Sequence, residues 1–117
     1  MTLEELKQRL EEGCRKLDLP EPIAVRHGFS FAKFELRIAP EISIEIYFNG
    51  ETRSLTSALI DRGERVFGID DYPASGVSHV HPFGRVEDHV KINPMQIEQM
   101  LEEYVRVLRQ LRAHKRG

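Results

Sequence analysis

Hydrophobic residues recur at helical spacing near the start of the chain. Thr2 is followed three positions later by Glu5, a capping-box pattern that begins helices. Proline cannot continue a helix, so Pro20 ends the segment. The pattern therefore predicts an amphipathic helix over about residues 3–17, with one buried face. Its apolar positions are Leu3, Leu6, Leu10, Cys14 and Leu17.

A second helical pattern occupies the end of the chain. Asn93 is a suitable N-cap, Pro94 is favoured at a first helical position, and Gln96 would complete a capping box. We therefore expect a helix from Pro94 onward, with Met100 and Tyr104 in the core rather than in a ligand site. The apolar stripe consists of Ile97, Met100, Leu101, Tyr104, Val105, Leu108 and Leu111.

Between these segments the hydrophobic period changes to two, which is typical of half-buried strands. Asn49-Gly50 is a strong turn signal and predicts a hairpin over residues 41–60. Residues 61–64 predict a second turn, and residues 70–76 a loop rich in Asp, Pro and Gly. The alternating apolar positions are Phe34, Leu36, Ile38, Ile42, Ile44, Ile46 and Phe48.

These elements predict an α+β fold in a single domain over residues 1–117. Consecutive strands with short turns form an antiparallel β-meander of four to six strands, and the N-terminal and C-terminal helices pack on one face of it. The other face stays free and polar. It is expected to carry Lys33, Glu35, Arg37, Ser43, Glu45, Tyr47 and Arg53.

Composition narrows the possible environments of the protein. The net charge of −2 does not favour a chain built as a whole for nucleic acid or membrane, although the end of the chain after Tyr104 is basic. A single cysteine, Cys14, excludes an intrachain disulfide and fits a reducing cytoplasm. The charged N-terminus and the lack of an apolar run of about 18 residues predict neither a signal peptide nor a membrane span.

The strongest chemical signal is a cluster of histidines. Three of the five histidines, His79, His81 and His89, fall within eleven residues. His79 and His81 are two positions apart, so in a strand both side chains leave the same face. Pro82 removes a backbone donor directly afterwards and marks the strand end. Arg85 lies between this pair and His89.

Three interpretations of the cluster stay open. In acid–base catalysis one imidazole is neutral, another is protonated, and Arg85 stabilises developing negative charge. In a metal site His79, His81 and His89 bind a divalent transition metal. In a structural role the strand end packs, and His89 pairs with a neighbouring carboxylate.

A family resemblance adds to this. Residues 44–71, IEIYFNGETRSLTSALIDRGERVFGIDD, form a strand, a turn, a strand and an aromatic-Gly-x-Asp ending, and a His-rich run follows. Over about residues 30–92 the chain resembles the TumE-type toxin family of prokaryotic toxin–antitoxin systems. The resemblance implies a small cytoplasmic protein whose meander precedes an aspartate-containing loop and a histidine cluster. The order of helix and meander is also similar to the RelE/barnase-like ribonuclease toxins.

The leading hypothesis is a toxin-like protein of a toxin–antitoxin pair, acting as a metal-independent endoribonuclease without a cofactor. The histidines would supply the acid and the base, and the arginine would stabilise the pentavalent phosphate. The residues assigned to catalysis are His79, His81, His89 and Arg85.

Binding is assigned to Arg53, Tyr47 and Asp70. The expected partners are an antitoxin protein, RNA and a second copy of the chain, with no membrane. Two alternatives remain: a non-catalytic module that binds protein or nucleic acid, and a small metal-binding protein using the histidine cluster.

Overall fold

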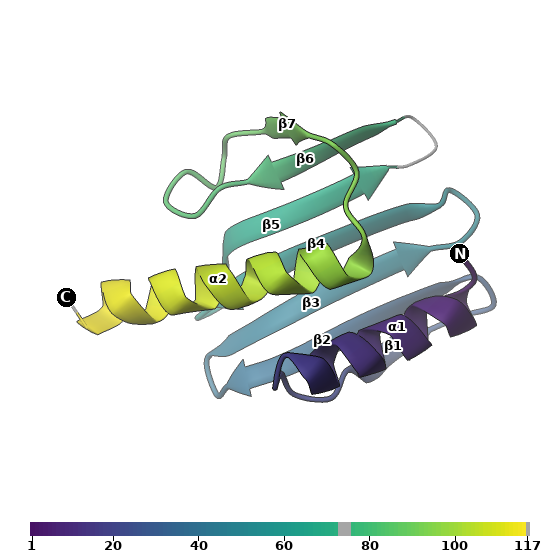
Figure 1. Cartoon of the computed structure of the whole chain (residues 1–117), viewed down its shortest axis with the longest axis horizontal. Helices are drawn as coiled ribbons and strands as arrows, with labels where there is room; N and C mark the ends of the chain where they lie inside the picture. The colour runs from purple at the N-terminus through teal and green to yellow at the C-terminus, as the bar shows by residue number, and fades with distance from the viewer. Residues whose placement is uncertain (73–75, 117) are drawn as a thin grey trace.

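The computed structural model describes residues 1–72 and 76–116, which form two helices and seven strands (Figure 1). Helix α1 spans Leu3–Lys16 and helix α2 spans Ile97–Arg116. The strands are β1 Ile23–His27, β2 Phe31–Ala39, β3 Ile42–Asn49, β4 Ser54–Asp61, β5 Glu64–Tyr72, β6 Val77–His81 and β7 Val90–Ile92.

All strands join one antiparallel sheet, in which each strand lies beside its neighbours in sequence. The predicted α+β meander is therefore confirmed, with seven strands in the described residues rather than four to six. The unpredicted strand is β7, whose three residues are too few to show an alternating pattern. At the other edge, β1 carries a bulge between Ala24 and Arg26.

Both helices cover the same face of the sheet, as predicted (Figure 1). The core lies between the helices and the alternate strand residues that point toward them. This packing gives every helix a buried stripe and every long strand one buried face. The residues with no exposed surface include Leu6, Leu10, Leu36, Ile44, Ile46, Leu59, Leu101, Tyr104 and Val107.

Helix α1 begins as its sequence predicts. The Thr2 side chain accepts a hydrogen bond from the Glu5 backbone N–H at 3.1 Å and caps the first turn. Cys14 is buried on the inner stripe, and burial raises the pKa of its thiol to about 11. The thiol therefore stays protonated at neutral pH and acts as a small core residue.

Tyr104 ties α2 to the centre of the sheet. Its hydroxyl donates to Ser57 Oγ at 2.7 Å, and the Ser57 hydroxyl donates to the Ile69 carbonyl at 2.9 Å. The Tyr104 ring packs edge-on against Phe67, with centroids 5.3 Å apart. Burial raises the pKa of Tyr104, so the hydroxyl remains a donor. Its predicted place in the core is confirmed.

The predicted hairpin is formed by β3 and β4. Its loop holds four residues, because Asn49 pairs with Ser54. Asn49 Oδ1 accepts hydrogen bonds from the backbone N–H groups of Glu51 and Thr52, and the positive φ, 56°, falls on Arg53. The turn is therefore an asparagine-stabilised loop rather than a two-residue turn on Asn49-Gly50.

Two predicted boundaries are wrong. The loop expected over residues 70–76 begins too early, because Asp70, Asp71 and Tyr72 are the last residues of β5; residues 73–75 lie outside the described part. The second helix begins at Ile97 rather than after Asn93. The Gln96 backbone N–H donates to Gln99 Oε1 at 2.9 Å, so Gln96 and Gln99 form the capping pair.

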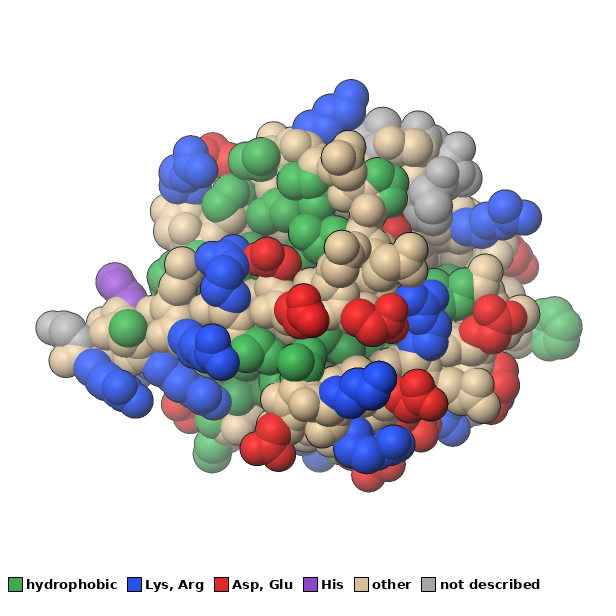
Figure 2. All heavy atoms as spheres, viewed as in Figure 1, with side chains coloured by type: hydrophobic (Ala, Val, Ile, Leu, Met, Phe, Trp, Pro, Cys, Tyr) green, Lys and Arg blue, Asp and Glu red, His purple; other side chains and the backbone are tan. Residues whose placement is uncertain are grey.

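The outer side of α2 is basic toward its C-terminal end (Figure 2). The Arg106 guanidinium contacts Glu103 at 2.6 Å, and Lys115 Nζ contacts Asp61 Oδ1 at 3.0 Å. This arrangement fits a solvated helix face with cations at the favourable end of the helix dipole. Within the described residues, neither helix combines the length and the apolar character needed to cross a membrane.

Candidate functional site

The face of the sheet opposite the helices is polar, as predicted. Lys33 Nζ contacts Glu45 at 3.4 Å, and Arg37 Nε contacts Glu35 at 3.0 Å. We call this surface the polar sheet face. Its residues on β2 to β6 include Lys33, Glu35, Arg37, Ser43, Glu45, Tyr47, Thr56, Ala58, Gly68, Asp70, His79 and His81.

Strand β6 places two histidines on this face. His79 lies opposite Asp70, and His81 lies opposite Gly68, whereas the intervening Val80 packs toward the core. The prediction that both imidazoles leave the same face is therefore confirmed. The strand ends at His81, directly before Pro82, where the missing N–H interrupts the ladder.

His81 is buried, with 2% of its surface exposed, and both ring nitrogens are used. Nδ1 lies 3.0 Å from the Val86 carbonyl oxygen, and Nε2 lies 3.0 Å from Asp70 Oδ2. A carbonyl and an ionised carboxylate only accept hydrogen bonds, so both bonds form together when the ring carries two protons. His81 thereby ties the loop after β6 to β5.

Gly68 lies beside this imidazole. A Cβ atom added at Gly68 would lie 2.9 Å from the Ser57 carbonyl oxygen and 3.7 Å from His81 Cδ2. The first distance is shorter than real Cβ contacts allow, so a larger residue would displace the β4 backbone, whereas the second is an ordinary van der Waals contact. Gly68 therefore permits the close approach of β4, and the His81 ring packs beside it.

The chain turns back in the loop between β6 and β7 (Figure 1). The ring contacts of His89 show that this loop brings it to the first two histidines. The His89 ring lies 4.4 Å from the His81 ring and 5.9 Å from the His79 ring, centroid to centroid. We call His79, His81 and His89 the histidine cluster. Lys91, two residues after His89, lies opposite His79 on β7. His79 is half-buried and His89 is exposed, so these two rings are open to a bound molecule.

Arg85 belongs to the same loop. Its backbone N–H donates to the Pro82 carbonyl at 3.0 Å, and its carbonyl accepts from the Asp88 N–H at 2.9 Å. The exposed guanidinium contacts the Asp88 carboxylate at 3.5 Å. An exposed pair of this kind is weak, so the guanidinium can exchange Asp88 for another anion.

A cavity of about 290 Å³ lies on the polar sheet face beside Asp70. Ala58 contributes only a methyl group to its lining, and Arg26 and Arg65 line it from β1 and β5. Neither arginine makes an ion pair with an acid in the described part of the chain. Tyr47 also lines the cavity, so two residues assigned to binding from the sequence, Tyr47 and Asp70, meet there.

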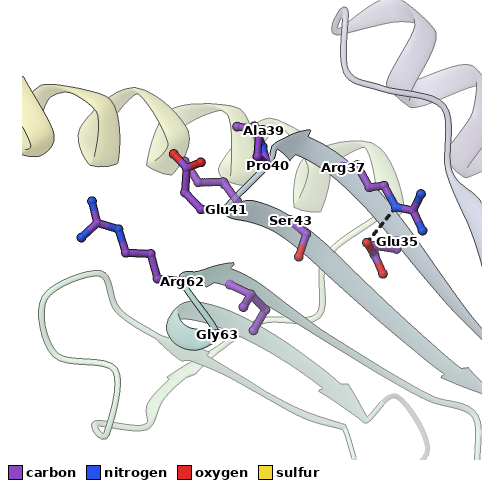
Figure 3. A pocket seen from close by; sticks show the side chains of 10 residues that line it. Glu35, Arg37, Ala39, Pro40, Glu41, Ser43, Arg62 and Gly63 are labelled. Atoms are coloured by element: carbon purple, nitrogen blue, oxygen red, sulfur yellow. Dashed lines mark hydrogen bonds and ion pairs between the residues drawn. The ribbon is translucent and has the colours of Figure 1, made fainter.

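A second cavity, of about 530 Å³, lies near the β2–β3 and β4–β5 turns (Figure 3). Arg37 and Glu35 form an ion pair on one side of it, and Arg62 extends from the opposite turn. Among the described residues, no histidine lines either cavity, but the first is lined by Asp70, whose carboxylate bonds to His81. The candidate site therefore lies beside the first cavity.

The expectation that Arg53 lies on the polar sheet face is wrong. Arg53 lies in the β3–β4 turn and lines a different cavity, together with Arg9, Asp71 and Met95. Its φ of 56° breaks the strand geometry, so the alternation that places Tyr47 on the polar sheet face does not extend to it. It therefore does not join the histidine cluster.

Three cations at the site were not predicted from the sequence: Arg26, Arg65 and Lys91. Lys91 could be placed only once β7 is known, because its position opposite His79 comes from the pairing of β6 with β7. Arg26 and Arg65 lie next to β-bulges, one between Ala24 and Arg26 and one facing Leu59 and Ile60. A bulge shifts the alternation of inward and outward side chains by one residue, so the sequence pattern does not predict the face on which either arginine lies.

The metal interpretation makes a separate prediction. Among the described residues, no group of three His, Cys, Asp or Glu side chains is arranged to hold a metal ion. His81 would have to release the Val86 carbonyl or Asp70 before it could bind one. We expect purified protein to hold less than about 0.1 equivalent of Zn, Ni, Mn or Fe by elemental analysis. Stoichiometric metal that survives dialysis, lost in His79→Ala, would establish the metal site instead.

No protein family, curated protein or solved structure compared with this chain matches it. The interpretation of the site rests on its geometry and its chemistry.

Proposed function

We propose that this chain is a toxin-like protein of a toxin–antitoxin pair, acting in the cytoplasm as a metal-independent endoribonuclease. One observation carries the proposal. The histidine cluster gathers on the polar sheet face, where His81 bonds to Asp70, and Asp70 lines a cavity that Arg26 and Arg65 also line. Acid–base groups next to unpaired cations are what cleavage of a phosphodiester requires.

His79 and His89 are the acid–base pair in this proposal. One neutral imidazole takes the proton of the ribose 2′-hydroxyl, whose oxygen then attacks phosphorus. The bond from phosphorus to the 5′ oxygen breaks, and the other imidazole, protonated, gives its proton to that oxygen. The products are a 2′,3′-cyclic phosphate and a 5′-hydroxyl end.

The charge that develops on the phosphate needs cations. Lys91 lies across from His79, and Arg85 is in the loop that carries His89. Either can approach a phosphate held between the two rings. His81 and Asp70 act as positioning residues, because their bond fixes the loop and with it the His89 ring.

The second candidate is a module that binds RNA or protein without cutting it. It is favoured by the burial of His81, which uses both its nitrogens for structure. In this case the edge-on contacts between the histidine rings hold the loop, and the cations on the polar sheet face bind a partner. An antitoxin would cover the same face under the first proposal, so partner binding alone does not separate the two.

The test is cleavage of RNA by the purified chain, freed from any antitoxin, in buffer with a chelator. We expect fragments that end in a 2′,3′-cyclic phosphate, identified by mass spectrometry. The activity should co-elute with the protein and disappear in the His79→Ala/His89→Ala double variant. Fragmentation that continues unchanged in this variant would mark a contaminating nuclease, and an inert wild type would reject the enzymatic proposal.

A further inference from the structure

We propose that the polar sheet face binds single-stranded RNA laid across the strands, with one base stacked on Tyr47 and phosphates at Arg26 and Arg65. This inference rests on the proposed function for the identity of its ligand and extends it to the path of the substrate. It assigns a role to residues that acid–base chemistry leaves unused.

The path follows one register row of the sheet. Arg26 pairs with Lys33, and Lys33 pairs with Tyr47. The row continues through Thr56 and Asp70 on the next two strands. It then ends with His79 opposite Lys91. Directly opposed residues point to the same face, so these side chains form one line from edge to edge.

The length of the row suits a short single strand. Neighbouring strands are about 4.8 Å apart, so the seven strands of the sheet set its ends roughly 29 Å apart. Protein surfaces that hold single strands cover about 4 nucleotides or more. The row has cations at both ends, Arg26 and Lys33 at one edge and Lys91 at the other, where a polyanion would enter and leave.

The adjacent row leaves a hollow beside this path. Glu45 is followed across the sheet by Ala58, Gly68 and His81. Ala58 and Gly68 are the two smallest residues and leave space at the centre of the face, beside the Arg65 side chain. The cavity of about 290 Å³ lies there, open toward Tyr47. This hollow can take the face of an unpaired base.

Tyr47 supplies the stacking surface. Its side chain is 37% exposed, and its ring lies 6.4 Å from the Phe31 ring with a tilt of 31°. Phe31 lies beside Tyr47, and the exposed part of the Tyr47 ring is the surface on which a base would stack. Stacking on an aromatic ring accepts any base, but a base inside a duplex is already stacked, so the site selects single strands.

Charge also favours a nucleic acid backbone. The two acids in the cavity are engaged: Glu45 contacts Lys33, and Asp70 contacts His81. Arg26 and Arg65 have no acidic partner within the described residues. A guanidinium presents paired donors that match phosphate oxygens, so these two arginines are the expected phosphate contacts.

Binding is tested with a fluorescein-labelled 2′-O-methyl RNA decamer, which lacks the 2′-hydroxyl nucleophile and so cannot be cut. We expect fluorescence anisotropy to give at least tenfold tighter binding of the single strand than of its duplex. Tyr47→Ala should weaken binding by about 5- to 100-fold, the usual effect of losing one base stack, and Tyr47→Phe should restore it. The control is Phe29→Ala, which removes a fully exposed aromatic outside the row.

The phosphate contacts are tested by salt dependence. For single strands, the slope of log affinity against log salt changes by about 0.7 for each phosphate contact. Arg26→Ala and Arg65→Ala should each reduce the slope by about that amount. The control, Arg109→Ala, removes an exposed arginine on α2 and should leave it unchanged.

These measurements separate the inference from the proposed function. Wild type that cleaves RNA while Tyr47→Ala binds the decamer normally would overturn the stacking path and leave the cleavage proposal standing. Binding that depends on Tyr47, Arg26 and Arg65 in a protein that cleaves nothing would support the path and reject the enzyme. Equal affinity for single strand and duplex, or no binding, would overturn the inference outright.

Discussion

Replacing His79 with alanine should lower the rate of RNA cleavage by about 100-fold or more, and His89→Ala should do the same. Both rings are accessible on the polar sheet face, and they lie 5.9 Å apart, close enough to act on one phosphodiester. Within the described residues, no hydrogen bond engages the ring nitrogens of His79 or His89. Loss of either should therefore remove catalysis without unfolding the chain, with stability changing by less than about 1 kcal/mol.

The matched control is His27→Ala, because His27 is also an exposed strand histidine but lies on β1, outside the cluster. Its activity should stay within about twofold of wild type. The rate of wild type should rise and then fall with pH, since the mechanism needs one neutral and one protonated imidazole. In the pH–rate profile, each single variant should lose either the rising or the falling limb. Unchanged cleavage in both His79→Ala and His89→Ala would remove these residues from the mechanism.

His81 should behave differently, because its ring is buried and bonded at both nitrogens. His81→Ala leaves the Val86 carbonyl without its donor and Asp70 without its partner. Lost buried hydrogen bonds of this kind cost about 1 to 3 kcal/mol each. Denaturant unfolding of His81→Ala therefore distinguishes a positioning residue from a catalytic one. If His81 is a positioning residue, the variant should lose both stability and cleavage activity.

Part of this site could be read from the sequence. The spacing of His79 and His81 and the proline after them correctly placed two rings on one face at a strand end. The return of His89 depends on a loop closed by the bond between the His81 ring and the Val86 carbonyl, five residues later, which no helix or strand pattern encodes. The His81 ring lies beside Gly68, and only the register of β5 against β6 brings these two residues together.

The predicted end of β5 and the predicted start of α2 are wrong for a related reason. Asp70 and Asp71 are polar residues that strands usually avoid, so they were predicted to be loop. In the structure each has a partner on β6: Asp70 bonds to His81, and the Asp71 carboxylate accepts the Ser78 hydroxyl. Similarly, Asn93-Pro94 is a sound helix start, but the Gln96 and Gln99 pair caps the helix three residues later. Tertiary pairing overrides local preference in both places.

The alternating pattern correctly predicts the core residues of the long strands. It also leads to the prediction with the largest effect on stability. Ile44→Ala should lower the free energy of unfolding by about 2 to 4 kcal/mol. Ile44 has no exposed surface and lies directly opposite Leu36 on β2 and Leu59 on β4, which are equally buried. Neighbours fixed in two strands cannot move together to fill the space, so the lost methyl groups leave a cavity.

The measurement is urea unfolding of the wild-type protein and the variant. The slope of the free energy of unfolding against urea concentration should be the same for both, so that the difference in midpoint reports stability. Ser43→Ala is the control, because Ser43 precedes Ile44 in β3 but points to the polar sheet face, where it lines a cavity. Its stability should stay within about 0.5 kcal/mol of wild type. If Ser43→Ala cost as much as Ile44→Ala, the face carrying Ser43 would be buried in solution. The polar sheet face would then not be open to RNA.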